Sequence, residues 1–394
     1  YNFEEEFRAV KWSLNMLVRV FASIRHRSSN NYRAASTFLF NVISNIIFII
    51  FRKQYIENIS GKTLITKKDK PLFLLLRYKF AHGDKNYGIS NENHAVTLPL
   101  KSSNICNLQE VYYDVDYGKS TCYGNNKVIN IIKDWNPDLI ILSSYTPGRL
   151  HQPEFDFLKL IKSNANIPFI NIWHDSIGSV LDESKLIKSP LIDLHVLLDS
   201  ANLLNKAGNK DKYIRLWAPI DQTFFYNRKI DNRDISVSFL GSTSSYRDIR
   251  KPYLDYLLSN NIDLYFSGGQ REELMSLEEY ASILKRSKIS INFSFSVDEQ
   301  SQLKVRVFEI LYSGSLLLES KNNETRKYFT PGVDYVEYVS KEDLLHKIRY
   351  YIAHEDERIK IALSGHKKAT TIYSHNQFWK KIVDRLSKNN ILEI

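Results

Sequence analysis

Short apolar runs that alternate with amphipathic stretches are the feature of this sequence that most restricts its fold. In the first half the runs are LFLLL, LIIL, FINI and LHVLL, at Leu72–Leu76, Leu139–Leu142, Phe169–Ile172 and Leu194–Leu198. Each has four or five residues, most with branched side chains, and is followed by polar or turn-forming residues, which is typical of a strand buried on both faces. Helical patterns lie between several of them, so the order predicts βα units around a parallel sheet.

A second series of the same kind follows the polar segment Asn227–Asp234, which we interpret as a linker. Its predicted strands cover residues 237–240, 263–266, 289–293 and 316–318, with predicted helices at 246–259, 277–287, 304–312, 341–353, 356–373 and 376–388. Two such series predict an α/β protein with two doubly wound, Rossmann-like domains and a cleft between them. A length of 394 residues is consistent with two domains.

The predicted organisation has four parts. They are an N-terminal helical segment (1–60), a first Rossmann-like domain (61–226), a second (227–373), and a C-terminal helix (374–394) that could cross back to the first.

The N-terminal segment contains the apolar stretch Ser36–Phe51. It is short for a bilayer crossing, and its polar residues Asn41, Ser44 and Asn45 share one helical face. We expect a packed or interface-lying helix; a membrane-surface anchor and a true span are the alternatives. The expected location is cytoplasmic, with peripheral contact at the inner membrane face left open. The chain starts at Tyr1 without the basic region of a signal peptide, so an upstream segment could be missing.

Composition narrows the class of partner. The formal net charge is +10, which favours anionic partners such as nucleotide phosphates, nucleic acid or an anionic membrane. The basic residues are scattered among acids without a basic stripe, so we do not expect nucleic acid. Cys106 and Cys122 are the only cysteines and form no CxxC pair, which argues against a disulfide scaffold or a cysteine zinc site.

The residues that follow the strand at 237–240 are candidates for binding an anion, because ligands of open parallel sheets bind outside the carboxyl ends of the strands. Gly241 allows close approach of the backbone, and Ser242 and Thr243 offer hydroxyl groups near a helix N-terminus. Arg247 lies in the first turn of that helix, where an anion nearby would offset its charge. The alternative is a serine-rich turn that only caps the helix.

The helix at 304–312 carries a sharper pattern. Lys304 and Arg306 open it, and Glu309 lies one turn later inside the near-apolar segment Phe308–Leu311. A buried glutamate is costly unless it is paired or contacts a ligand. The combination suits a nucleoside diphosphate, with cations for the phosphates and the carboxylate for the ribose hydroxyls. The alternative is an internal ion pair between Glu309 and an arginine.

Three motifs follow one another from this helix onward. They read R-x-F-E-x-L-x-x-G, then y-F-x-x-G-x-d-y-v-x-Y, then h-x-x-e-R-x-x-I-A-x-x-G. The matching residues are Arg306, Phe308, Glu309, Leu311, Gly314, then Tyr328, Phe329, Gly332, Asp334, Tyr335, Val336, Tyr338, and then His354, Glu357, Arg358, Ile361, Ala362 and Gly365. With these motifs, the chain from about Val237 to Leu386 resembles the C-terminal half of GT-B glycosyltransferases, closest to the spore-maturation-protein (CgeB-like) and group 1 type.

The resemblance implies an enzyme that moves a sugar, a hexose or a pentose, from a nucleotide diphosphate-sugar to a saccharide, lipid-linked or protein acceptor. It implies that Glu309 binds the donor ribose and that Arg247, Lys304 and Arg306 face the diphosphate. The alternatives are a sugar-nucleotide epimerase on the same fold, or a non-catalytic protein that binds nucleotides or anionic surfaces.

One departure from the family pattern concerns the donor sugar. Many retaining members have a second glutamate eight positions before the ribose glutamate, and this chain has Ser301 there. Either the loop is shifted, or the sugar is contacted by Ser301 and Gln302 or by backbone groups. The donor sugar and the retaining or inverting outcome therefore stay open.

The first half resembles the family more weakly. The segment Asn166–Asp175 is similar to the strand end of retaining GT-B enzymes whose histidine reaches the donor sugar, so His174 and Asp175 are the predicted catalytic residues. A structural role for His174 is the alternative. The acceptor loop is expected after the first strand, with the candidates His82, Asp84 and Tyr87, and with His94 as a weaker one.

No cofactor and no metal site are expected. Asp114 and Asp116 form the one DxD that we considered, but they lie in an aromatic, strand-like segment and are predicted to be at the surface. The family generally stabilises the leaving diphosphate with basic side chains and helix dipoles, a role that Arg247, Lys304 and Arg306 would fill.

Overall fold

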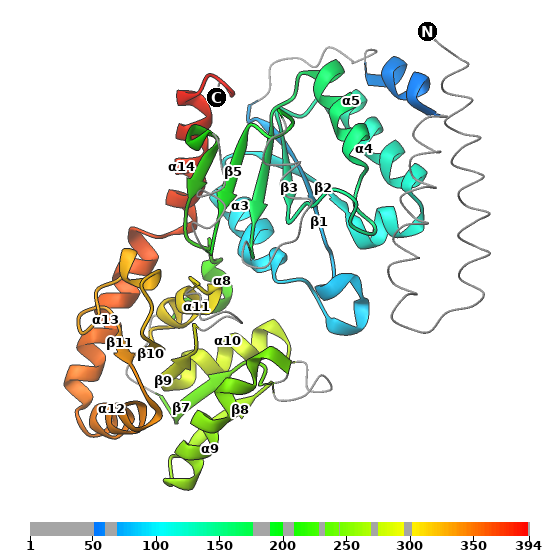
Figure 1. Ribbon diagram of the computed structural model, residues 1–394. Helices are drawn as coiled ribbons and strands as arrows, with labels where there is room; N and C mark the ends of the chain where they lie inside the picture. The colour runs from blue at the N-terminus through cyan, green and yellow to red at the C-terminus, as the bar shows by residue number, and fades with distance from the viewer. Residues whose placement is uncertain are drawn as a thin grey trace, which may run out of the picture.

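The structure, a computed structural model, describes residues 51–59, 69–175, 190–199, 209–227, 233–243, 245–268, 275–294 and 302–392. Residues 51–59 are helical; the rest of the predicted N-terminal helical segment, most of the stretch 36–51, and Ser301 lie outside the described residues. The chain forms two α/β domains, each with one parallel sheet between helices (Figure 1). The predicted fold class is thereby confirmed.

The first sheet has six parallel strands in the order β2-β1-β3-β4-β5-β6. They are β1 (Leu72–Arg77), β2 (Asn107–Tyr112), β3 (Leu139–Ser143), β4 (Phe169–Trp173), β5 (Leu194–Leu197) and β6 (Tyr213–Arg215). The four predicted apolar runs are β1, β3, β4 and β5, which are buried along their whole length. The two edge strands, β2 and β6, were not predicted.

Helices cover both faces of this sheet. They are α3 (Leu98–Ser103), α4 (Thr121–Trp135) and α5 (Phe155–Ala165), with short 3-10 or π segments η1 (Ala81–Gly83), η2 (Lys85–Tyr87), η3 (Asn93–Thr97), η4 (Tyr113–Tyr117) and η5 (Lys210–Lys212). The short helix α8 (Gln222–Phe225) packs instead against α10 (Leu277–Arg286) and α11 (Val305–Ser313) of the second domain. Helix α4 starts where the Ser120 side chain accepts a hydrogen bond from the Tyr123 amide, and it ends at the left-handed Asn136. Helices α4 and α5 share a core with Tyr55 of the 51–59 helix on one face.

The second sheet has five parallel strands in the order β11-β10-β9-β7-β8. They are β7 (Ile235–Leu240), β8 (Leu264–Ser267), β9 (Ser287–Asn292), β10 (Leu316–Ser320) and β11 (Val336–Tyr338). The helices are α9 (Lys251–Ser259), α10 (Leu277–Arg286), α11 (Val305–Ser313), α12 (Lys341–Ala353), α13 (Glu355–Thr371) and α14 (His375–Lys388), with η6 (Ser245–Arg250) and η7 (Thr325–Lys327). The predicted helix 246–259 is thus a 3-10 segment that continues as α9, and β11 was not predicted as a strand.

In both sheets the strand order reverses once, between β1 and β3 in the first and between β7 and β9 in the second. Open α/β sheets bind ligands outside the carboxyl ends of their strands at these positions. The two switch points are therefore the places to look for a site.

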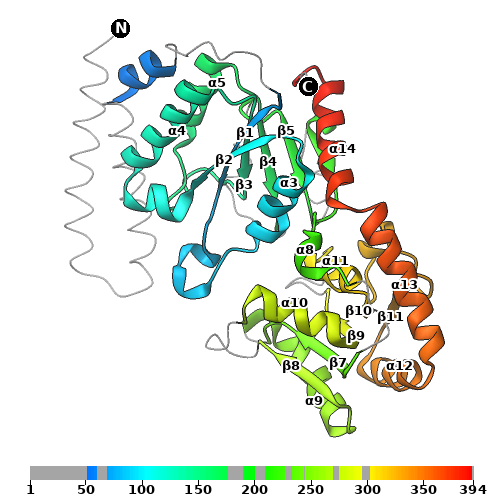
Figure 2. The ribbon, with the colours of Figure 1, turned by 180° about the vertical axis from the view of Figure 1, so that it is seen from behind.

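Helix α14 leaves the second domain and packs against α3 of the first (Figure 2). Phe378, Trp379, Ile382 and Leu386 belong to the same core as Leu100. That core also contains side chains from both sheets, so the domains meet through continuous apolar packing. Within the described ranges, none of the helices has the length and apolar character that a bilayer crossing requires.

Candidate active site

At the switch point of the second sheet, the guanidinium of Arg306 lies close to the backbone of Gly241. A Cβ added to Gly241, at the end of β7, would lie 2.7 Å from Nη2 of Arg306. A Cβ added to Gly268, where φ is +105°, would lie 2.9 Å from the carbonyl carbon of Gly241. Only glycine fits both turns without displacement. Arg306 therefore lies directly against the turn after β7, where its Nη1 donates to Oδ1 of Asn292 at 3.3 Å.

Further cations gather at the same edge. Nη1 of Arg250 donates to the carbonyl oxygen of Ser242 at 2.9 Å. Lys304 lies at the N-terminus of α11, and its pKa is lowered to about 8. Burial is the main cause; the charges of Arg247 and Arg250 also lower this pKa, while those of Asp175 and Asp199 raise it. The predicted diphosphate residues Gly241, Ser242, Thr243, Arg247, Lys304 and Arg306 are thus brought to one edge of the sheet.

Arg250 belongs to this group and was missed in the sequence. The spacing could have indicated it, because Arg250 lies three residues after Arg247 and therefore one helical turn further along the chain.

Glu309 lies on α11 at the interface between the domains and is buried. Its Oε1 is 2.9 Å from Nε2 of His94, which comes from η3 of the first domain. Its Oε2 accepts a hydrogen bond of 2.7 Å from the Tyr280 hydroxyl of α10. Burial raises the pKa of this carboxyl, but the bonds from His94 and Tyr280 and the charge of Arg306 outweigh it, so the pKa lies below its usual value.

Both carboxylate oxygens of Glu309 therefore have protein partners, one from each domain. The predicted alternative, an internal Glu309–arginine pair, is replaced by a histidine and a tyrosine. His94, the weakest of the acceptor candidates, is the first-domain residue that reaches this carboxylate, and neither it nor Tyr280 showed a sequence signal for that contact.

The predicted catalytic residues lie at the carboxyl end of β4. Nε2 of His174 is 3.1 Å from Oγ of Ser143, at the end of β3. Burial, with a smaller contribution from the charge of His94, lowers the pKa of His174 to about 4, so its ring is neutral at neutral pH. Oδ1 of Asp175 accepts a hydrogen bond of 2.9 Å from Nε2 of Gln302, the predicted donor-sugar residue of the second domain.

Gln302 is a second bridge between the domains. Its Nε2 also lies 3.3 Å from Oδ2 of Asp199, and its Oε1 accepts a hydrogen bond from Nζ of Lys304. The strand-end residues of the first domain are therefore in direct contact with the start of α11, the helix that carries Arg306 and Glu309.

A pocket of about 410 Å³ lies in the first domain beside the β1–β3 switch point. It is lined by Tyr78, His82, Gly83, Ser90, Glu92, Ser144, Arg149, Leu150 and His151. Burial raises the pKa of Glu92 to about 7 despite hydrogen bonds from the Tyr78 amide, Ser143 and Ser144.

Of the three predicted acceptor residues, only His82 lines this pocket. The Asp84 side chain instead accepts a hydrogen bond from the Asn86 amide at the start of η2. The Tyr87 ring packs edge-on against His82 with ring centroids 5.4 Å apart. Glu92 was missed because nothing in its sequence context marks it as buried.

The DxD residues were expected at the surface, and for Asp116 this is wrong. Asp116 is buried, its carboxylate pairs with Lys127 at 2.8 Å, and the segment is the π-helical η4. Asp114 is half-buried and accepts hydrogen bonds from the amides of Lys79 and Phe80. Both carboxylates therefore have structural partners. Across the described ranges, no three His, Cys, Asp or Glu side chains are grouped as metal ligands would be.

Comparisons with known proteins bear on the fold and on the second domain. Residues 235–384 match a family model described as "Glycosyl transferase-like", and no curated protein matches the chain. Among solved structures, the chain is similar to Anabaena HepE in complex with UDP and glucose (TM-score 0.55, 11% identity, 81% of this chain and 100% of that one). It is also similar to a sucrose-phosphate synthase from Thermosynechococcus elongatus (0.53, 10%, 81% and 100%) and a glycosyltransferase from Rickettsia africae (0.52, 11%, 81% and 99%).

These likenesses extend over nearly the whole length of those proteins. The chain therefore has the GT-B fold, and its second domain matches the glycosyl transferase-like family model.

Proposed function

We propose that the protein is a glycosyltransferase that moves a sugar from a nucleotide diphosphate-sugar to a saccharide, lipid-linked or protein acceptor. The observation that carries the proposal is the position of Arg306 against the Gly241 backbone, at the switch point of the second sheet. Lys304, Arg247 and Arg250 add positive charge at the same edge. The match of residues 235–384 to the glycosyl transferase-like family supports the same reading.

The proposed donor is a UDP-sugar. Anabaena HepE, which shares the fold at 10% identity, has been solved in complex with UDP-glucose. As the bond to the sugar breaks, negative charge develops on the leaving diphosphate, and cations already in place stabilise it without reorganisation. We propose that Arg306, Lys304 and Arg247 supply this stabilisation, and we expect turnover to survive EDTA.

The proposed ribose contact of Glu309 involves a rearrangement. The side chain is buried, with one carboxylate oxygen bonded to His94 and the other to Tyr280. We propose that a ribose hydroxyl reaches the carboxylate by replacing one of these partners. His94 is the partner from the opposite domain, so a small opening between the domains would free Oε1 while Tyr280 keeps Oε2 in place. We propose that donor binding exchanges His94 for a ribose hydroxyl.

On the first-domain side, we propose that His174 and Asp175 orient the donor sugar. His174 is neutral at pH 7 and offers one nitrogen to Ser143, while Asp175 holds Gln302 beside Lys304. We propose that the pocket of Glu92 and His82 receives the acceptor.

A panel of nucleoside diphosphates and their sugars, followed by thermal unfolding, tests the donor assignment, because a ligand that binds the native state raises its unfolding temperature. UDP and at least one UDP-sugar should stabilise the wild type. No response to any nucleoside diphosphate would contradict the proposal.

A labelled UDP-sugar then separates the two enzyme classes. A glycosyltransferase leaves the labelled sugar on an added acceptor or on water. Conversion into an isomeric nucleotide sugar without an acceptor would identify an epimerase instead.

A further inference from the structure

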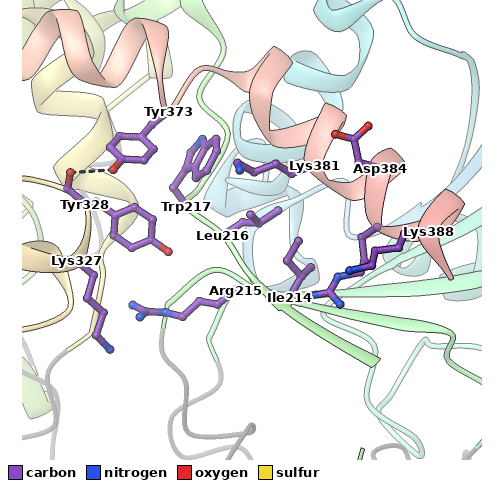
Figure 3. A pocket seen from close by; sticks show the side chains of 11 residues that line it. Ile214, Arg215, Leu216, Trp217, Lys327, Tyr328, Tyr373, Lys381, Asp384 and Lys388 are labelled. Carbon is purple, nitrogen blue, oxygen red and sulfur yellow. Dashed lines mark hydrogen bonds between the residues drawn. The ribbon is translucent and has the colours of Figure 1, made fainter. Parts of the chain in front are cut away.

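A second pocket, of about 560 Å³, lies where the two domains are joined (Figure 3). One part of its wall is β6 and the segment after it, a second part is Lys327 and Tyr328 beside η7, and a third is α14 with Tyr373 before it. Its lining residues are Ile214, Arg215, Leu216, Trp217, Lys327, Tyr328, Tyr373, Lys381, Asp384, Arg385 and Lys388. None of the proposed donor, sugar or acceptor residues lines it.

The lining is strongly basic. Lys381, Arg385 and Lys388 occur at i, i+4 and i+7 of α14, so they share one face of that helix. In Figure 3, Lys381 extends from α14 toward Trp217. Arg215 and Lys327 complete a set of five cations, against one lining carboxylate, that of Asp384.

The acids near the pocket do not neutralise this set. Arg215 and Lys327 share the single carboxylate of Glu324, with Lys327 at 2.8 Å. In the described part of the chain, no ion pair is made by Lys381, Arg385 or Lys388. Like charges held together repel one another, so this side of the pocket attracts an anion.

The wall behind the cations is built from packed aromatic side chains. Trp217 is 2% exposed, and its ring packs edge-on against Tyr373 with centroids 5.0 Å apart. The Tyr373 hydroxyl donates to the Tyr328 carbonyl oxygen at 3.0 Å, and the Arg215 guanidinium lies 5.5 Å from the Tyr328 ring. Nε of Arg215 is buried and has no hydrogen-bond partner among the described residues. Guanidinium and ammonium donors held on a fixed frame suit phosphate oxygens.

We propose that this hinge pocket binds a phosphate-bearing polyanion, at a site separate from the donor diphosphate site. Its phosphate groups would contact the α14 cations Lys381, Arg385 and Lys388, with Lys327 on the opposite wall. Such a ligand touches both domains at their junction and favours the arrangement in which these walls are close. The phosphate could belong to a soluble compound or to a lipid headgroup.

Calorimetric titration of the full chain with inorganic pyrophosphate at low salt tests the site. The titration is done in an Arg306→Ala background, which weakens the donor site. That variant should still bind pyrophosphate, and the added substitutions K381A, R385A and K388A should weaken binding at least tenfold. The matched control removes three exposed cations outside the pocket, K360A, K367A and K380A, and should stay within twofold.

No pyrophosphate binding in the Arg306→Ala background would overturn the proposal, as would unchanged binding after the pocket substitutions or an equal loss in the control. If the triple variant fails to fold, the single substitution Lys381→Glu replaces it and should also weaken pyrophosphate binding. Because UDP binding is measured separately, failure here does not bear on the proposed glycosyltransferase activity.

Vesicles distinguish the two sources of phosphate. For a lipid headgroup, cosedimentation with phosphatidylcholine vesicles should rise when phosphatidic acid is included, and the pocket substitutions should remove the rise. For a soluble ligand, pyrophosphate binds while the pocket substitutions leave cosedimentation unchanged. If the pocket variant keeps both its pyrophosphate binding and the rise in cosedimentation with phosphatidic acid, the proposed site is refuted.

Discussion

The two sides of the domain interface are built on the same kind of sheet edge but carry opposite chemistry. On the second-domain side, the strand ends present Gly241 and the cations around Arg306. On the first-domain side, His174 follows β4 and Glu92 precedes η3 beside the β1–β3 switch point, and burial favours the neutral forms of both. The second-domain side therefore carries a cluster of cations, whereas the first-domain side combines these two groups with the carboxylates of Asp175 and Asp199.

Removing the central cation should have the largest effect. We expect Arg306→Ala to lower kcat/KM for the donor by about 100- to 1,000-fold, because loss of one preorganised charge donor typically costs that much. Arg349→Ala, an exposed arginine on α12, is the matched control and should leave turnover within twofold. Steady-state kinetics with a UDP-sugar checks both, and equal losses would place the effect outside the site.

On the opposite side, Glu92→Gln should change the pH dependence of stability. The folded-state pKa of about 7 lies above the ordinary value of 4.5, so the folded protein binds more protons than the unfolded chain between these values. Stability therefore falls as the pH rises from about 4.5 through 7, by on the order of 3 kcal/mol from this group. Urea unfolding at pH 5 and pH 8 should show a smaller drop for the variant; an identical drop would mean that Glu92 is not held neutral.

The close approach at the switch point can be tested with one methyl group. In Gly241→Ala, the new Cβ would lie 2.7 Å from Nη2 of Arg306, so the guanidinium must move, and we expect about a tenfold loss of UDP affinity. Gly118→Ala is the control, since nothing lies within 4 Å of its Cβ position. Calorimetry on the two variants measures the difference. If both bind UDP like the wild type, the turn does not position Arg306.

The smallest expected effect links the two sides. The charge of Asp175 raises the pKa of Lys304, so Asp175→Asn should lower that pKa further below about 8. A smaller fraction of the Lys304 side chain would then be protonated at pH 8. The affinity for UDP should therefore fall a few-fold at pH 8 and much less at pH 6.5. A loss that is equal at both pH values would show that Asp175 acts through packing rather than through charge.

The central strands and the gathering of cations at the end of β7 could be predicted because each depends on neighbours in sequence. Buried strands such as β3 and β4 are continuous apolar runs, whereas β2 is half-exposed and β6 has three residues, so neither leaves a clear pattern. Gly241 directly follows β7, and Arg247 lies in the next helical segment, η6. The bond between His94 and Glu309 joins residues 215 positions apart, and no local pattern encodes it.

The return of α14 to the first domain has a consequence for synthesis on the ribosome. Leu100 and Leu386 lie in the same core, so that core cannot close until almost the entire polypeptide has been made. The second domain has its own core among β7, β9, β10 and α12, and it can form earlier. A nascent chain that stops after residue 373 should therefore leave the domain that was translated first unfinished.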